Sequence, residues 1–155
     1  MIPFISTSAA LAPVQVHKRE PQPTQLSAFA NTGATPWLYS ALGQIRDIEE
    51  NHNRLVLGIG DFRDVGETAK TTRQLLSLVD MVDLPVPLVS PVSGGAMSIT
   101  WSMGAREVKF SLFPDRQALF YRYMDDEPID DGGVVNLGDP NSARDPLKWM
   151  INPTT

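Results

Sequence analysis

The stretch that decides the fold opens on a glycine pair and then alternates apolar and polar residues: Gly94-Gly95-Ala96-Met97-Ser98-Ile99-Thr100-Trp101. Alternation with a period of two is typical of a β-strand that buries one of its faces. Met97, Ile99 and Trp101 are expected to share the buried face, and the polar residues between them the other face. We therefore predict the first strand of an antiparallel meander here.

Two further alternating runs follow, separated by short turns at Gly104 and at Pro114-Asp115. The core-facing residues of the second run are predicted to be Val108, Phe110 and Leu112. The third run, residues 118–124, alternates less cleanly because Leu119, Tyr121 and Tyr123 compete with Phe120 and Met124 for the inside. Apolar residues on both faces favour a central strand or a covered face.

Helical periodicity occurs on both sides of the meander. A first helix is predicted from Trp37 to about Asn51–Asn53, with Thr35 as its cap and Pro36 at its first position. A second is predicted over residues 67–82, and a short third helix from Asp139-Pro140 through Ile151. The second helix is expected to bury Leu75, Leu76, Val79 and Val82. The run 55–60 is interpreted as a short strand or loop, and residues 134–137 as a fourth strand.

These elements predict an α+β fold, in which a small antiparallel meander of three to four strands packs against two to three helices. Residues 1–36 contain five prolines among Ser, Thr, Ala and Gln, a composition typical of extended or flexible backbone. We expect residues 1–36 to form a Pro-rich N-terminal arm and residues 37–155 a single α+β domain, since this length suits one core.

Composition excludes several classes of function. The chain has no cysteine, which rules out disulfides, thiolate zinc sites and cysteine nucleophiles and fits a cytoplasmic location. The net charge is −5 and the basic residues are scattered, so direct nucleic-acid binding is not expected. No apolar stretch approaches the roughly 20 residues that span a bilayer, and the N-terminus lacks a basic region typical of a signal peptide. We expect no membrane association.

No catalytic, cofactor-binding or metal-binding motif is predicted. The run Gly58-Ile59-Gly60-Asp61 lacks the third glycine of a dinucleotide fingerprint and the Gly-Lys-Ser/Thr ending of a phosphate loop. His17 and His52, the two histidines of the chain, have no neighbouring carboxylate and hydroxyl that would indicate a triad. One enzymatic alternative stays open, a hydrolase that uses the carboxylates Asp61, Asp64 and Glu67 or a metal at an acidic loop.

The candidate partner-binding residues lie at and after the end of the meander: Trp101, Tyr121, Tyr123, Asp125, Asp126, Glu127, Asp130 and Asp131. The five acidic residues are interpreted as a solvated loop, as a surface that complements a basic protein, or as a metal loop, although their spacing does not match an EF-hand. Trp101 is interpreted as a core residue or as a half-exposed anchor for a partner.

Residues 68–123 resemble a group of small bacterial proteins of uncharacterised function. The shared layout is a helix, a proline-bearing link, a glycine pair, an alternating strand that ends in Trp, a charged second strand and an aromatic third. The matching features are Leu75-Leu76, Pro85-Val86-Pro87, Pro91, the run from Gly94 to Trp101, Glu107-Val108-Lys109-Phe110 and Tyr121. The resemblance implies an antitoxin-like adaptor, one member of a two-gene bacterial or mobile-element module, and brings no catalytic residues.

The residues and the resemblance together favour a non-enzymatic protein-binding module whose partner is another protein, with a basic one fitting the acidic loop. Homo-oligomerisation through the N-terminal arm stays open. So does a third function, a structural subunit of a virus-like or self-assembling particle, in which Pro-rich arms exchange between neighbours.

Overall fold

The computed structural model describes residues 35–55, 65–152 and 154, all within one compact unit that spans residues 34–155. Its helices are α2 (Pro36–Leu55), α3 (Val65–Val79) and α4 (Pro140–Ile151). Its strands are β1 (Leu88–Val92), β2 (Ala96–Met103), β3 (Arg106–Leu112), β4 (Ala118–Met124), β5 (Glu127–Pro128) and β6 (Gly133–Val134). The strands form one antiparallel sheet in the order β1-β2-β3-β4-β5, and β6 also pairs with β4. The predicted α+β fold is confirmed.

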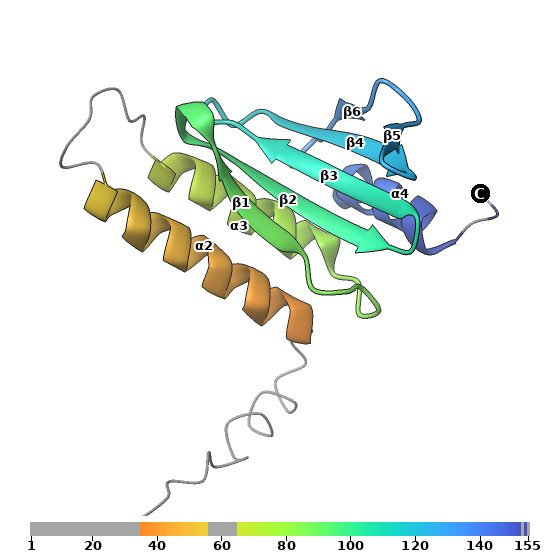
Figure 1. Cartoon of the computed structure of the whole chain (residues 1–155), viewed down its shortest axis with the longest axis horizontal. Coiled ribbons are helices and arrows are strands. Elements are labelled where there is room, and N and C mark those ends of the chain that lie inside the picture. Colours follow the sequence, from red (N-terminus) through yellow and green to blue (C-terminus); the bar gives the residue numbers. More distant parts are fainter. Residues whose placement is uncertain (1–34, 56–64, 153, 155) are drawn as a thin grey trace, which may run out of the picture. The chain divides into compact units, whose positions relative to one another are not determined.

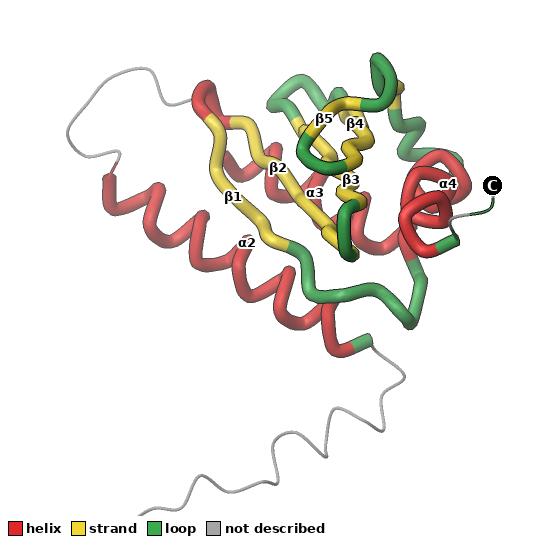
Figure 2. The backbone as a smooth tube through the Cα atoms, turned by 45° about the vertical axis from the view of Figure 1, so that its right-hand side comes forward, coloured by secondary structure: helices red, strands yellow, loops and turns green. Residues whose placement is uncertain are grey.

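The helices lie on one side of the sheet. In Figure 1 the strands β1 to β3 pass in front of α3, while α2 runs along the β1 edge. Figure 2, turned by 45°, shows α2 along the β1 edge and α4 to the right of β3. The register places Met97, Ile99 and Trp101 of β2 opposite Leu112, Phe110 and Val108 of β3, and all six side chains are fully buried.

Each helix contributes an apolar stripe to this core. The buried residues are Trp37, Ala41 and Ile45 from α2, Leu75, Leu76 and Val79 from α3, and Ala143, Leu147 and Met150 from α4. The Trp101 ring meets Trp37 and Phe110 edge to face, with ring centroids 5.6 and 5.8 Å apart. Such pairs add to the free energy of burying the rings.

Polar side chains fasten the helices at two places. The buried Thr68 hydroxyl of α3 donates to the Gly95 carbonyl oxygen at 2.6 Å, in the turn where Gly94 and Gly95 both have positive φ. That backbone conformation explains the glycine pair, because other residues adopt it at a cost. At the far end of α3, the Arg144 guanidinium of α4 donates to the carbonyl oxygens of Leu78 and Val79 at 2.9 and 3.3 Å. Arg144 thereby caps the C-terminus of α3.

Several boundaries differ from the prediction. β1 was expected as a proline-bearing link, but residues 88–92 pair with β2, and Pro91 is tolerated because β1 is an edge strand. α3 ends at Val79 because Asp80 takes a φ of 29°, which leaves Val82 71% exposed instead of in the buried stripe. Of the predicted fourth strand, residues 134–137, only Val134 lies in a strand, β6, which pairs with β4. The first helix continues to Leu55, and the third matches the prediction.

Residues 1–34 of the predicted arm and residues 56–60 of the predicted strand or loop lie outside the described part of the chain.

Candidate interaction surface

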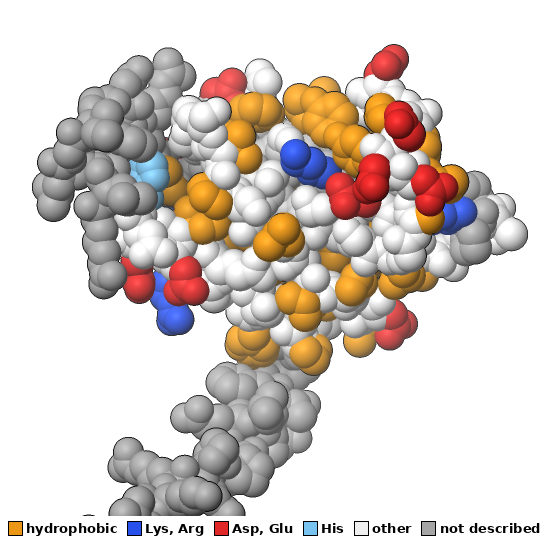
Figure 3. Space-filling model, in the orientation of Figure 1, with side chains coloured by type: hydrophobic (Ala, Val, Ile, Leu, Met, Phe, Trp, Pro, Cys, Tyr) orange, Lys and Arg blue, Asp and Glu red, His pale blue; other side chains and the backbone are white. Residues whose placement is uncertain are grey.

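The face of the sheet that points away from the helices is a candidate interaction surface, and we call it the open face. By register it consists of Leu88, Ser90 and Val92 from β1, Ala96, Ser98, Thr100 and Ser102 from β2, Glu107, Lys109 and Ser111 from β3, and Leu119, Tyr121 and Tyr123 from β4. No described helix covers it. Figure 3 views the molecule from this side and shows hydrophobic side chains among polar surface, with carboxylates gathered toward the right.

Both edges of the sheet are covered in part. At β1 the Gln44 side chain of α2 replaces a neighbouring strand: its Oε1 accepts from the Val89 N–H at 2.8 Å and its Nε2 donates to the Pro87 carbonyl at 2.9 Å. At β4 the chain folds back through β5 and β6, and the Ile129 N–H donates to the Arg122 carbonyl at 3.0 Å. Unpaired edge groups invite pairing with another chain. A partner therefore meets side chains of the open face in preference to the sheet backbone.

Tyr121 and Tyr123, two of the predicted partner-binding residues, lie on the open face and are half-buried. Phe120 lies on the opposite face of β4, where it packs against Phe110 in the core. The register thus resolves which apolar residues of the third run face outward. Tyr rings present a large apolar body and a polar hydroxyl, a combination that is enriched at interfaces.

The predicted acidic residues surround the end of β4. Asp125 and Asp126 have φ of 51° and 65° and form a two-residue hairpin turn between Met124 and Glu127. Asp130 is ion-paired with Arg122 and also accepts from the Gly132 N–H at 3.0 Å. Four carboxylates therefore remain exposed in the segment that follows β4, and we call these the acidic turn: Asp125, Asp126, Glu127 and Asp131.

Trp101 is not part of this surface. Its side chain is 0% exposed and projects to the helix side of the sheet, so the core interpretation applies and the anchor interpretation is wrong. Its indole Nε1–H has no hydrogen-bond partner in the described part of the chain. An unmade bond of this kind costs about 1–3 kcal/mol, which the burial of the ring offsets.

Of the three carboxylates proposed for a hydrolase, only Glu67 lies within the described residues. Asp61, Asp64 and His17 lie outside the described residues. Glu67, in the first turn of α3, binds Lys70 at 2.6 Å and lies 3.6 Å from Arg116. The hydrogen bond from Lys70 lowers the pKa of Glu67 below its ordinary value, whereas a general acid needs a raised one. Among the described residues, no group of three His, Asp or Glu side chains converges as a metal site.

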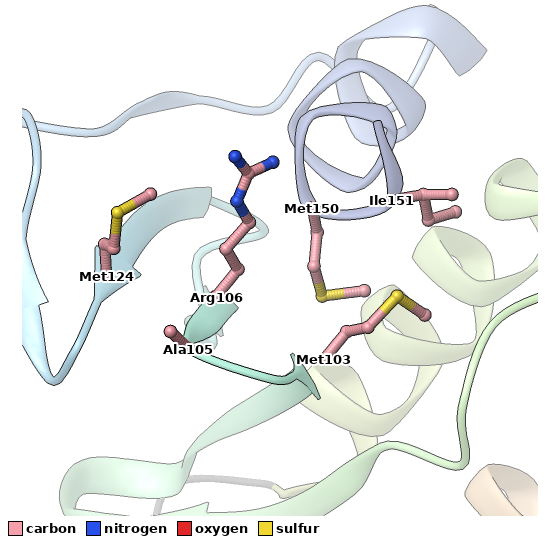
Figure 4. A pocket seen from close by; sticks show the side chains of 6 residues that line it. All are labelled: Met103, Ala105, Arg106, Met124, Met150 and Ile151. Atoms are coloured by element: carbon pink, nitrogen blue, oxygen red, sulfur yellow. The ribbon is translucent and has the colours of Figure 1, made fainter. Parts of the chain in front are cut away.

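A second feature, not predicted from the sequence, is a hollow of about 410 Å³ on the helix side of the sheet, near the acidic turn. Its lining, which we call the methionine hollow, is Met103, Ala105, Arg106, Met124, Met150 and Ile151. Figure 4 shows Met103 and Met150 pointing toward each other and the Arg106 side chain rising between Met124 and Met150. These residues come from three strands, a turn and a helix, and no local pattern in the sequence connects them.

The end of α4 is held over this hollow by two arginines. The Arg106 guanidinium donates to the Trp149 carbonyl at 2.7 Å and lies 5.1 Å from the centre of the Trp149 ring. Arg122 approaches the same ring at 5.4 Å. Cation–π contacts of this kind fix both the ring and the cations. A smaller hollow of about 310 Å³ lies beside them, lined by Arg122, Asp145, Lys148 and Trp149.

No protein-family model, curated protein or solved structure was found to match this chain. None of the helices in the described part of the chain is long and apolar enough to cross a membrane.

Proposed function

We propose that this protein is a non-enzymatic protein-binding module whose open face receives a basic partner. The observation that carries the proposal is a four-stranded sheet face without a described helix over it, bordered by the acidic turn. Aromatic and aliphatic side chains supply contact area, and the hydroxyl groups that are not buried supply hydrogen-bonding groups: Ser90, Thr100, Ser102 and Ser111.

Charge supports the choice of a basic partner. The chain carries a net charge of −5, and the acidic turn concentrates four exposed carboxylates in the segment that follows β4. Charges at the rim of an interface accelerate association and suppress wrong partners more than they add affinity. In a two-gene bacterial or mobile-element module, a binder of this type would act as the neutralising or adaptor partner, as the sequence resemblance implies.

The proposal is tested by co-purification from the native cell. We expect a stoichiometric basic companion whose affinity falls at least tenfold in Tyr123→Ala, as for a central aromatic contact. Asp125→Asn with Asp126→Asn should slow association and weaken its dependence on salt. The matched control is Tyr39→Ala, a 40% exposed tyrosine on α2, which should bind as the unmodified protein does.

Two results would contradict the proposal: the absence of a stoichiometric companion, or a companion retained equally by all variants. A large closed oligomer of the purified protein in size-exclusion chromatography would instead support the self-assembling subunit.

A further inference from the structure

The methionine hollow is an open depression with a largely apolar lining, in which an apolar group can lie against the methionine side chains. Its volume of about 410 Å³ lies in the lower part of the range for ligand sites, about 300–1,000 Å³. Met150 is buried at 2% exposure, whereas Met103 is 37% exposed. Methionine is unbranched and polarizable, so a lining with three of them adapts to aliphatic or aromatic side chains of different shape.

The hollow is continuous with the acidic turn. Met124 lines the hollow and directly precedes Asp125 in the chain. The Asp125 N–H donates to the carbonyl oxygen of Ala105, another lining residue, at 2.9 Å. The exposed carboxylates of Asp125 and Asp126 therefore begin one residue beyond the apolar wall.

The distribution of charge orients what binds there. On the α4 side, the guanidinium of Arg106 stacks on Trp149 and repels a cation. On the opposite side, the carboxylates of the acidic turn attract one. A ligand with an apolar group in the hollow and a positive charge beside it therefore binds in one orientation, with its charge toward the acidic turn and away from Arg106.

The hollow and the open face lie on opposite sides of the sheet, because Met103, Arg106 and Met124 have the opposite parity to Ser102, Glu107 and Tyr123. The turn at Asp125 and Asp126 directly follows β4, at the end of the sheet between these two sides. A partner that contacts both sides therefore passes around the end of the sheet at the acidic turn.

We infer that the methionine hollow receives one large apolar side chain of the partner, and that a Lys or Arg adjacent to it in the partner binds the acidic turn. This inference rests on the proposed function, because it describes the same partner at the end of the same sheet.

The test uses the full chain labelled with ¹⁵N at its amides and with ¹³C at its methionine methyl groups, of which there are six. The probes are isobutanol and three synthetic peptides: acetyl-Lys-Lys-Leu-Lys-amide, the same peptide with Ser for Leu, and the same peptide with Glu for each Lys. We expect the leucine peptide to shift the methyl signals of Met103 and Met124 saturably. The signal of Met97, which is fully buried in the core, should stay in place as the internal control.

Binding of the serine peptide should be at least tenfold weaker, because the burial of leucine is lost. The glutamate peptide should not bind. Asp125→Asn with Asp126→Asn should weaken the leucine peptide about three- to tenfold, whereas Asp47→Asn on α2 should not. The two asparagine substitutions fall at an exposed turn and leave the core intact.

Three results would overturn the inference. If the amide signals of Tyr121 and Tyr123 shift while the methionine methyls do not, the hollow is not the socket and the proposed function stands. If isobutanol shifts the same methyls and the charges of the peptides make no difference, the hollow binds small apolar molecules instead. If no probe shifts any signal, the inference fails, and the native companion decides the proposed function separately.

Discussion

The side chain of Gln44 provides the sharpest test of how the sheet is closed. Its amide oxygen accepts from the Val89 N–H at 2.8 Å and its amide nitrogen donates to the Pro87 carbonyl at 2.9 Å, both in partly buried surroundings. Gln44→Ala removes both bonds and exposes the β1 edge to other chains. The same substitution on an exposed helix would change stability little.

The magnitude follows from the number of bonds lost. Each hydrogen bond contributes about 0.5–1.5 kcal/mol net, so Gln44→Ala should lower the free energy of unfolding by about 1–3 kcal/mol. Water that reaches Val89 or Pro87 would move the value to the lower end. With a urea slope of about 1–3 kcal/mol per molar, the midpoint should fall by roughly 1 M.

Urea unfolding followed by circular dichroism measures this effect, with two controls. Gln74→Ala, on α3, removes only a long exposed bond to the Leu137 carbonyl and should cost less than about 0.5 kcal/mol. Gln44→Glu keeps an acceptor for Val89 but lacks a donor for Pro87 until the carboxyl is protonated, so part of the loss should be recovered in acid. Sedimentation should reveal concentration-dependent self-association of Gln44→Ala through the opened edge. If the free energy of unfolding of Gln44→Ala is within about 0.5 kcal/mol of that of the unmodified protein, and the variant stays monomeric, the Gln44 side chain does not protect the β1 edge.

Three further substitutions test the fold. Gly132→Ala should lower the free energy of unfolding by about 3 kcal/mol or more, because at a φ of 71° the added Cβ would collide with the backbone oxygen of Phe120. The control is Gly104→Ala, which has a similar φ of 61° but open space around the Cβ and should cost about 1 kcal/mol. Equal losses in thermal unfolding would contradict the contact with Phe120. Leu147→Ala, in the fully buried stripe of α4, should cost about 2–5 kcal/mol by urea titration, and a smaller loss would mean that α4 is loosely docked. The pKa of Glu67 is lowered, so its ionised form stabilises the fold above its ordinary pKa, and this contribution is lost as the pH falls through the lower folded pKa. The stability difference between the unmodified protein and Glu67→Gln should therefore shrink as the pH falls from neutral to below the ordinary carboxyl pKa, and salt should reduce it. A difference that is independent of pH would contradict the ion pair.

The sequence predicted those elements whose pattern is local. Alternation with a period of two, bounded by glycine and proline turns, predicted β2, β3 and β4. Asp139 followed by Pro140 predicted the start of α4, and the Asp139 carboxylate does accept from the Asn141 N–H there. β1 was missed because its five residues include Pro91 and lack a long alternating run. A strand of this length is defined mainly by its partner, and pairing partners are not visible in the strand itself.

The candidate surface was predictable only in part. Tyr121, Tyr123 and the acidic residues follow from strand order, since they lie at the end of the meander. Their separation from Trp101 depends on the register across two turns, which puts Trp101 on the opposite face. The methionine hollow could not be predicted, because its walls come from residues up to 48 positions apart, from Met103 to Ile151.

Because Arg144 of α4 caps the end of α3, α3 and the sheet reach their final packing only after α4 has docked. During synthesis, α3 and the meander leave the ribosome before α4, and until then the carbonyls of Leu78 and Val79 and the apolar floor beneath Leu147 have no cover. Such a nascent chain exposes apolar surface and is a substrate for chaperones and proteases. Loss of the last helix by truncation should therefore remove the protein from the cell by degradation, before any weakening of binding is noticed.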